Sequence, residues 1–492
     1  MVRNFQSFEP ATGAQMWEGQ YGNVDQAVEI AQTTWPKWAA LSLNERLKRI
    51  RAVAGRLSVE GEKFVDLISR ETGKPLWEAR IEVESLTRTI QESVRSFAER
   101  TPQRLLNGKQ FERQALRHKP HGVMAVLGPF SSPAAAPHGH IIPALIAGNT
   151  VVFKPSELTP ATGEQLVRLY RLAGIPEGVV ELVQGDNETG AKLAAHGDIA
   201  GILFTGSAGA GISINRQFAS QPNKLLSLQM GGNNPIIAWD TKNIHAMAAV
   251  IIQSAFLSAG QKCTNARRLI LTDDMFEILM PEVKKLADRL IISEPHGDPV
   301  PFMGPVIDNQ SADGLVESFL ALMSHGGRPI RHMKSPVKNR PFITPGIIDV
   351  TDVKDRPDIE LFGPLLQVIR VNSFEDAIKE ANNTRFGLSA SLLGGSDEQF
   401  DQFWANSRAG IVNRNTATNS EINGAPIGGI GLSGNNRPSG FYAADYCGYP
   451  VISTEKAELK AMIGVGMRDE MENIMSPEVK KNIANNAALV SA

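Results

Sequence analysis

The chain of 492 residues contains only two cysteines, Cys263 and Cys447. Two thiols cannot form a disulfide framework, and these two lack the local spacing of a zinc site, so we expect neither disulfides nor a metal centre. This scarcity favours a reduced, cytoplasmic protein. It also means that a thiol taking part in chemistry would act alone, as a nucleophile.

Long apolar runs and charge bias are also missing. No stretch approaches the roughly 18 apolar residues of a membrane-spanning helix, and the N-terminal "MVRNFQSFEPATGAQMWEG" lacks the apolar segment of a secretory signal. Lysine and arginine number 50 against 52 aspartate and glutamate, and no block of like charge stands out. We therefore expect no membrane segment and no nucleic-acid partner.

The length of the chain, with 42% hydrophobic residues, indicates two or three domains. Residues 25–100 carry apolar side chains at helical spacing. From residue 121, short apolar runs alternate with helical segments, which predicts a parallel, doubly wound α/β sheet with ligand sites at the carboxyl ends of its strands. A second alternating series, from about residue 234 to 430, predicts another α/β domain.

These patterns divide the chain into parts. The segment 103–120 contains an N-G turn and predicts a hairpin outside either core, and the end of the chain is polar and helix-prone. The expected parts are a cofactor domain of residues 1–102 and 121–232, a catalytic domain of residues 233–446, separate segments at 103–120 and 447–458, and a tail at 459–492.

The segment "FTGSAGAG" ends a strand pattern and opens a helix, so its backbone N–H groups can face a phosphate. The candidate cofactor-binding residues are Gly206, Ser207, Ala208, Gly209, Ala210 and Gly211. A plain strand–helix turn explains the segment equally well. A literal G-x-G-x-x-G occurs at Gly429, Gly431 and Gly434, but no strand precedes it and no helix follows it, so it is the weaker candidate.

Two charged residues, Lys154 and Glu157, end the strand pattern of "NTVVFKPSE". A carboxylate there can accept hydrogen bonds from ribose hydroxyls and would repel a 2′-phosphate, which favours NAD over NADP. Taken in isolation, the pair is better explained as a surface salt bridge.

Cys263 stands in "AGQKCTNARR", after a turn of small residues and among polar and cationic neighbours. Structural cysteines usually have apolar neighbours, whereas this setting supports a thiolate. Cys447, in "YAADYCGYP", is interpreted as a packing residue.

Five stretches occur in order along the chain: "NTVVFKPSE", "FTGS", "GGNNP", "GQKCTNARR" and "ELFGP". Together they strongly resemble the NAD(P)-dependent aldehyde dehydrogenase superfamily, over roughly residues 5–455. Within it, "GGNNP", "AFLSAGQKCTNARR" and "NNRPSGFYAADYC" look most like the bacterial branch that oxidises succinylglutamate semialdehyde in arginine catabolism.

The resemblance implies a mechanism. Cys263 would attack an aldehyde and form a thiohemiacetal, which passes hydride to NAD and leaves a thioester that water hydrolyses. Glu360 resembles the residue that holds the nicotinamide ribose, and Phe362 the residue beside the nicotinamide. Arg437 and Ser439 would hold a substrate carboxylate, although a simple rim loop explains them equally well. The hairpin and the segment 447–458 would pair between subunits, giving a homodimer or homotetramer.

The chain departs from the resembled family at catalytic positions. Gln229 stands where the family has a glutamate that activates the deacylating water, and an amide lacks that basicity. Ser131 stands where the family has an asparagine that donates to the oxyanion; a hydroxyl can donate, but over a shorter reach. Altered pocket positions are Ala134, Ala135, Ala136 and Arg414, and structural roles are expected for His138 and His140.

Three functions remain open from the sequence. The first and favoured one is an NAD-dependent aldehyde dehydrogenase whose deacylation is impaired or relocated. The second is a catalytically silent NAD-binding or scaffold protein, and the third is a dehydrogenase that transfers the acyl group to coenzyme A. Gln229 marks either a natural loss of the base or an engineered substitution, and Ser131 argues against a lone engineered change.

Overall fold

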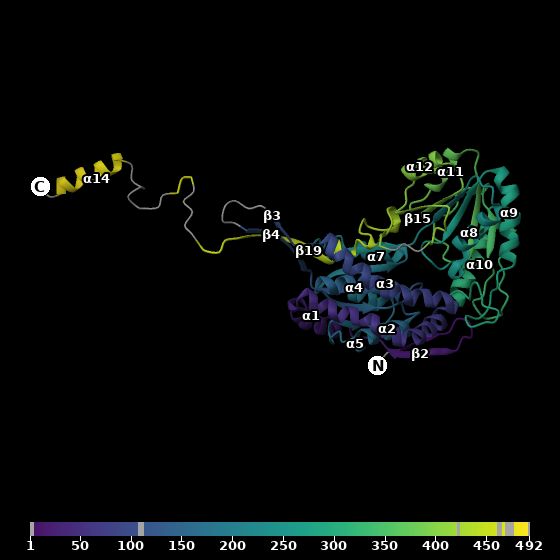
Figure 1. Ribbon diagram of the computed structural model, residues 1–492, viewed down its shortest axis with the longest axis horizontal. Helices are drawn as coiled ribbons and strands as arrows, with labels where there is room; N and C mark the ends of the chain where they lie inside the picture. Colours follow the sequence, from purple (N-terminus) through teal and green to yellow (C-terminus); the bar gives the residue numbers. More distant parts are fainter. Residues whose placement is uncertain (1–3, 107–112, 421–423, 460–464, 468–476, 491–492) are drawn as a thin grey trace. The chain divides into compact units, whose positions relative to one another are not determined.

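The computed structural model describes residues 4–106, 113–420, 424–459, 465–467 and 477–490. Contacts group the chain into two units, one of residues 1–102 and 118–450 and the other of residues 103–117 and 451–492. The first unit contains both large sheets (Figure 1).

The first unit begins with an antiparallel hairpin, which the sequence patterns did not predict, and three long helices. These elements are β1 (Asn4–Phe8), β2 (Gln15–Gln20), α1 (Val24–Ala40), α2 (Leu43–Thr72) and α3 (Leu76–Arg100). Helix α2 starts where Ser42 and Glu45 form a reciprocal capping box and ends at Gly73, whose φ of 77° suits glycine. The expected helical region therefore contains three helices.

A five-stranded parallel sheet follows, with strand order β7-β6-β5-β8-β9. Its strands are β5 (Val123–Leu127), β6 (Thr150–Lys154), β7 (Val180–Leu182), β8 (Ile199–Gly206) and β9 (Leu225–Met230). Its intervening helices are α4 (Ala135–Ala147), α5 (Pro160–Leu172), α6 (Asn187–Ala195) and α7 (Ala208–Phe218). The order reverses between β5 and β8, and this switch point is where doubly wound sheets bind ligands.

Both faces of this sheet are covered, because successive strand residues point to opposite sides. Along β5, Met124 and Val126 pack in a core with α2, α3, α4 and α5, whereas Val123, Ala125 and Leu127 pack in a second core with α1, α6 and α7. This arrangement explains why the strands read as continuous apolar runs.

The second sheet has seven strands in the order β12-β13-β14-β11-β10-β15-β16, all parallel except β12. They are β10 (Asn234–Ala238), β11 (Ala266–Leu271), β12 (Arg328–Arg331), β13 (Gly346–Asp349), β14 (Leu365–Arg370), β15 (Ser389–Leu393) and β16 (Ile411–Arg414). The helices are α8 (Ile244–Phe256), α9 (Asp273–Asp288), α10 (Asn309–Ser324), α11 (Phe374–Ala381) and α12 (Asp397–Asn406). Figure 1 shows α8, α9 and α10 grouped with this sheet.

Short elements complete the first unit: η1 (Leu257–Gly260), β17 (Pro426–Ile427), η2 (Gly431–Ser433), β18 (Ser439–Gly440) and α13 (Ala443–Cys447). The literal G-x-G-x-x-G lies around η2, not at the start of an α-helix. In the described part of the chain, no helix is both long and apolar enough to cross a membrane.

The second unit contains most of a small three-stranded sheet, with strand order β19-β4-β3. Its strands are β3 (Arg104–Leu106), β4 (Arg113–Pro120) and β19 (Gly448–Glu455), and α14 (Pro477–Val490) forms part of the tail. Strands β3 and β4 are antiparallel. The N-G turn falls outside the described residues. The hairpin and the segment near residue 450 thus pair within one chain, and pairing between subunits stays a prediction.

Candidate active site

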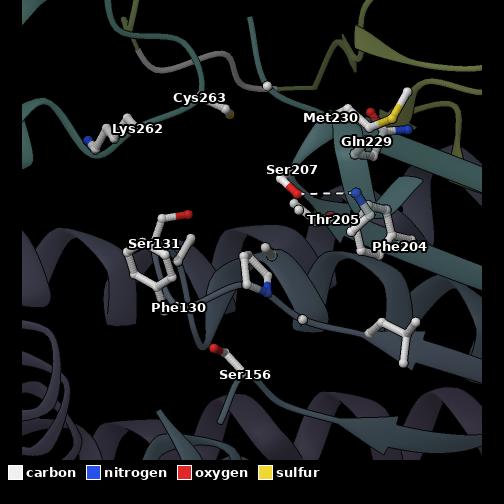
Figure 2. Close-up of a pocket in the computed structure, with 18 of the residues that line it drawn as sticks. Phe130, Ser131, Ser156, Phe204, Thr205, Ser207, Gln229, Met230, Lys262 and Cys263 are labelled. Atoms are coloured by element: carbon white, nitrogen blue, oxygen red, sulfur yellow. Dashed lines mark hydrogen bonds between the residues drawn. The ribbon is translucent and has the colours of Figure 1, made fainter. Parts of the chain in front are cut away.

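A cavity of about 1400 Å³ lies beside the carboxyl ends of β5, β6, β8 and β9. Its lining includes Ser131 from the loop after β5, Gln229 from β9, and Cys263 from the loop after η1. Figure 2 shows these three residues around the same space as Ser207 and Ser156. The fold therefore gathers all three predicted catalytic positions from segments far apart in the sequence.

The turn before Cys263 has an unusual backbone. Ser258, Ala259 and Gly260 have φ values of 55°, 52° and 73°, and such left-handed conformations cost non-glycine residues roughly 1–2 kcal/mol each. A Cβ on Gly260 would lie 2.1 Å from backbone atoms of Gly363, so no other residue fits there. Strain of this kind persists only where the surroundings hold the turn in place.

Asn234, in "GGNNP", holds the loop that carries Cys263. Its Nδ2 donates to Cys263 O at 2.7 Å and Asn265 O at 2.8 Å, and its Oδ1 accepts from Ser389 N at 3.0 Å. It is 1% exposed, so water cannot replace these bonds. The sequence named the motif without giving this residue a role.

Replacing Asn234 by alanine is expected to lower the free energy of unfolding by about 2–5 kcal/mol, because three buried backbone groups lose their partner. Denaturant titration measures this change. Asn383→Ala is the control, because Asn383 is exposed and its side chain donates to Glu380 at the surface, at 3.1 Å; this variant should change stability little. Equal stability losses in the two variants would contradict the assignment.

The Cys263 thiol is half-buried, and its pKa is raised to about 11. Burial is the largest cause, and the Glu360 carboxylate adds to the rise, while Arg267 and Lys262 oppose it. In this state the thiol is mostly protonated at neutral pH, so a step that uses the thiolate must first lose the proton.

The alkylation rate of Cys263 by iodoacetamide is expected to rise about tenfold per pH unit between roughly pH 7 and 10, because only the thiolate reacts below the pKa. Glu360→Gln removes a negative charge and should shift the curve to lower pH. Cys447 is 0% exposed and serves as the internal control, with mass spectrometry assigning the label. A plateau already below about pH 8 would contradict the raised pKa.

Gln229 holds the segment after η2 against strand β9. Its backbone bridges Gly434, and its Nε2 donates to Arg437 O at 2.6 Å. The neighbouring Leu228 N donates to Asn435 Oδ1 at 2.9 Å, so the segment after η2 is fastened along the free edge of β9. A carboxylate has no hydrogen to donate to a carbonyl, so the bond to Arg437 O requires the amide.

The first glycine of "GGNNP", Gly231, is explained by Glu360. A Cβ on Gly231 would lie 1.7 Å from Glu360 Oε2, so the carboxylate can occupy its place only beside glycine. Arg267 lies 3.6 Å from Glu360 Oε1 and donates to Gly260 O at 2.6 Å, which links Glu360 to the Cys263 loop. Burial raises the pKa of Glu360, opposed by Arg267.

Ser131 lies in a loop positioned by Glu82 of α3. The carboxylate of Glu82 accepts from Ser132 Oγ and from the N–H groups of Ala134 and Ala135, at 3.0–3.2 Å. Phe130 and Phe362 pack edge to face across the cavity, with centroids 5.8 Å apart. Ser131 and Phe362 therefore line the same space as Cys263.

All of the predicted nucleotide residues except Gly211 also line the cavity. Ser207 caps α7 by accepting from Ala210 N at 3.3 Å, and a Cβ on Gly209 would meet no atom within 4 Å, so the first turn of α7 faces open space. Gly211 lets α7 approach β9, since a Cβ there would lie 2.3 Å from Met230 Sδ. The other lining positions are Gly206, Ala208, Ala210, Lys154 and Glu157.

Lys154 and Glu157 are 3.9 Å apart, so the alternative interpretation as an ion pair also has a structural basis. Lys154 Nζ donates to Pro155 O at 2.7 Å, and burial lowers its pKa. The ion pair and the predicted ribose contact are compatible, because a carboxylate 3.9 Å from its partner can still accept hydrogen bonds from ribose hydroxyls.

The two predicted substrate residues are not brought together. Ser439 lines the cavity, but Arg437 does not; its Nη1 donates to Leu226 O at 3.3 Å. Arg414 also lies outside the lining, with its Nη1 2.6 Å from Asp397 Oδ1. The substrate-carboxylate role of Arg437 therefore stays a prediction.

The histidines of α4 differ. His138 bonds Tyr170 OH and Leu86 O, which gives it a structural role. His140 lines the cavity and contacts Thr205 Oγ1 at 2.9 Å. Burial lowers the pKa of each to about 4, so both are neutral at neutral pH.

Comparison with known proteins identifies the family of the chain. The sequence profile of the Aldehyde dehydrogenase family matches residues 2–449. Curated relatives include the N-succinylglutamate 5-semialdehyde dehydrogenases of Sphingopyxis alaskensis (61% identity, 95% of this chain and 98% of that one) and Chromobacterium violaceum (46%, 91% and 92%).

Solved structures agree on the fold. An NADP-dependent enzyme of E. coli is 28% identical with a TM-score of 0.86, covering 92% of this chain and 95% of that one. PnpE from Pseudomonas sp. WBC-3 is 27% identical with a TM-score of 0.87, covering 94% and 96%. The chain belongs to the aldehyde dehydrogenase family.

Proposed function

We propose that this enzyme uses NAD to oxidise N-succinylglutamate 5-semialdehyde, or a closely similar semialdehyde, through a thiohemiacetal and a thioester on Cys263. The observation that carries the proposal is one cavity lined by the Cys263 thiol and by the N-terminus of α7. The 61% identical relative bears the name of this substrate, which supports the choice.

The first half of the reaction uses groups that are present. The Cys263 thiolate attacks the aldehyde carbon, and the Ser131 hydroxyl, on the facing loop, donates to the developing oxyanion. NAD, when bound, accepts the hydride. Glu360 would accept hydrogen bonds from the nicotinamide ribose, and Phe362 would pack beside the ring. An oxyanion donor is typically worth roughly 2.7–4 kcal/mol, so a hydroxyl of shorter reach slows this half.

The second half lacks its usual base in the resembled mechanism. Gln229 has no basic atom, and its amide is engaged with Arg437 O. Loss of a positioned general base costs about 10²- to 10⁴-fold, so we infer that thioester hydrolysis is slower than thioester formation.

NAD is proposed over NADP because Glu157 lines the nucleotide side of the cavity. A carboxylate near the ribose repels a 2′-phosphate. The similar E. coli structure is of an NADP-dependent enzyme, so family membership alone does not decide the cofactor. We also propose a homodimer or homotetramer built through the sheet of β3, β4 and β19, which light scattering in solution tests.

Nucleotide reduction in the first turnover tests the proposal. The protein is mixed with NAD or NADP and with succinylglutamate semialdehyde, using propanal as an uncharged aldehyde for comparison. We expect NADH to form faster than NADPH and the semialdehyde to react at lower concentration than propanal. A preference for NADP, or no reduction with either aldehyde, would contradict the proposal; NADH formed only with coenzyme A would favour the acylating alternative.

A further inference from the structure

Glu78, in the first turn of α3, is a buried carboxyl group without a role in the steps described above. It is 5% exposed and lines the cavity together with Ser258 and Cys263. Its Oε1 accepts from Ser258 Oγ at 2.7 Å, which anchors the left-handed turn that leads to Cys263. Within the part of the chain that the structure describes, its Oε2 has no hydrogen-bond partner.

Glu82, one turn further along α3, shows what a purely structural carboxylate looks like here. Its Oε2 lies 2.7 Å from Lys74 Nζ, and its Oε1 accepts from Ser132 Oγ and two backbone N–H groups. Both oxygens of Glu82 therefore have donors, whereas one buried oxygen of Glu78 has no hydrogen-bond donor among the described residues. A buried acceptor without a donor calls for an explanation such as catalysis or a water molecule.

Two other titratable residues line the cavity and also have a buried polar atom without a hydrogen-bond partner among the described residues. They are His140 and Glu360. Burial lowers the pKa of His140 to about 4, which makes it a weak base. Glu360 lies against Gly231 and beside Arg267. The family resemblance already assigns Glu360 a different role, binding the nicotinamide ribose. Glu78 is the remaining candidate, and it contacts the turn that carries the nucleophile.

The charged groups that face Glu78 are Lys262, next to Cys263 in the chain, and Lys74, before α3. Burial raises the pKa of Glu78, while these lysines and the Ser258 bond oppose the rise. A carboxylate with a raised pKa is a stronger base than an exposed one, so it is better suited to accept a proton from water.

We propose that Glu78 is the general base of thioester hydrolysis, in place of the carboxylate that position 229 lacks. This inference rests on the proposed thioester at Cys263. Glu78 takes one proton from a water molecule as the water oxygen bonds the carbonyl carbon. The carbon–sulfur bond then breaks, the electron pair goes to sulfur, and the proton on Glu78 passes to the leaving Cys263 thiolate. The products are a carboxylic acid and the free thiol.

An activated ester tests this step without NAD or any aldehyde. With p-nitrophenyl acetate, acylation of Cys263 releases a burst of nitrophenolate, and the following linear phase reports hydrolysis of the acetyl thioester. Glu78→Gln keeps the size and an acceptor for Ser258. It should preserve the burst and lower the linear rate about 10²-fold or more. Glu84→Gln, on the exposed face of the same helix, is the matched control and should leave both phases unchanged.

The pH profile separates a base from a structural residue. The wild-type linear rate should fall on the acid side as Glu78 becomes protonated, and this limb should be absent in Glu78→Gln. An unchanged linear rate in Glu78→Gln, or a wild-type rate no faster than spontaneous thioester hydrolysis, would overturn the proposal. If Glu78→Gln loses the burst, Glu78→Asp decides: a retained burst with a slower linear phase supports the base, and loss in both variants contradicts it.

This readout is independent of the proposed function. Failure to form NADH from the semialdehyde would reject the proposed aldehyde or cofactor while leaving the ester phases interpretable. Normal NADH formation with an unchanged ester profile in Glu78→Gln would reject only the role of Glu78.

Discussion

Replacing Gln229 by glutamate is expected to raise the steady-state rate of NADH formation by about 10- to 10²-fold. A carboxylate at this position can take a proton from the deacylating water, and a positioned base is worth about 10²- to 10⁴-fold. The gain falls at the low end because Glu78 already supplies part of this catalysis in the proposed mechanism. Steady-state NADH absorbance measures the change, and the rate constant of NADH formation in the first turnover should stay the same.

The control for this variant is Gln229→Ala, which also removes the bond to Arg437 O but adds no base. Both variants should lose about 0.5–1.5 kcal/mol of stability, because the segment after η2 loses this side-chain hydrogen bond to β9. Thermal denaturation measures the loss. Only the glutamate variant should turn over faster. In the Gln229→Glu background, Glu78→Gln should have little further effect, since two bases that serve one step are not additive. Faster turnover in both single variants would mean that loss of the hydrogen bond to Arg437 O, and not the added carboxylate, speeds the reaction.

Cys263→Ala is expected to abolish NADH formation from the semialdehyde, with a loss of at least about 10⁴-fold, because the Cys263 sulfur forms the covalent intermediate in the proposed mechanism. Cys447→Ala is the matched control. That thiol lies in α13 and is fully buried, so its loss should cost stability without removing activity. Rapid-mixing absorbance measures the first turnover in each protein. A persistent burst in Cys263→Ala would place the nucleophile elsewhere.

Much of the fold could be predicted from local patterns. Strands such as Thr150–Lys154 are continuous apolar runs because both faces of the sheet are covered, and the alternation with helices indicates a parallel sheet. The N-terminal hairpin of β1 and β2 escaped prediction, because its strands are short and mostly exposed and carry little apolar periodicity.

The site was predictable only in part. Cys263 and the start of α7 could be predicted as candidates because backbone turns and small residues leave a local signal, and both line the same cavity. The partners of these segments could not. Ser258 and Glu78 are 180 residues apart, and Gln229 and Arg437 are 208 apart, so their contacts depend on how the two sheets pack. Arg437 illustrates the limit: its motif suggested a substrate contact, whereas its guanidinium bonds the backbone of β9.

One measurement tests the central claim, that thioester hydrolysis is slower than thioester formation. Wild-type protein is mixed rapidly with NAD and succinylglutamate semialdehyde, NADH is followed through and beyond one equivalent, and samples are quenched for mass spectrometry. We expect a burst of about one NADH per active site, then a slower linear phase, with the acyl group on Cys263 during that phase. A single linear phase with no acylated Cys263 would contradict it, because hydrolysis would then be as fast as oxidation despite the amide at position 229.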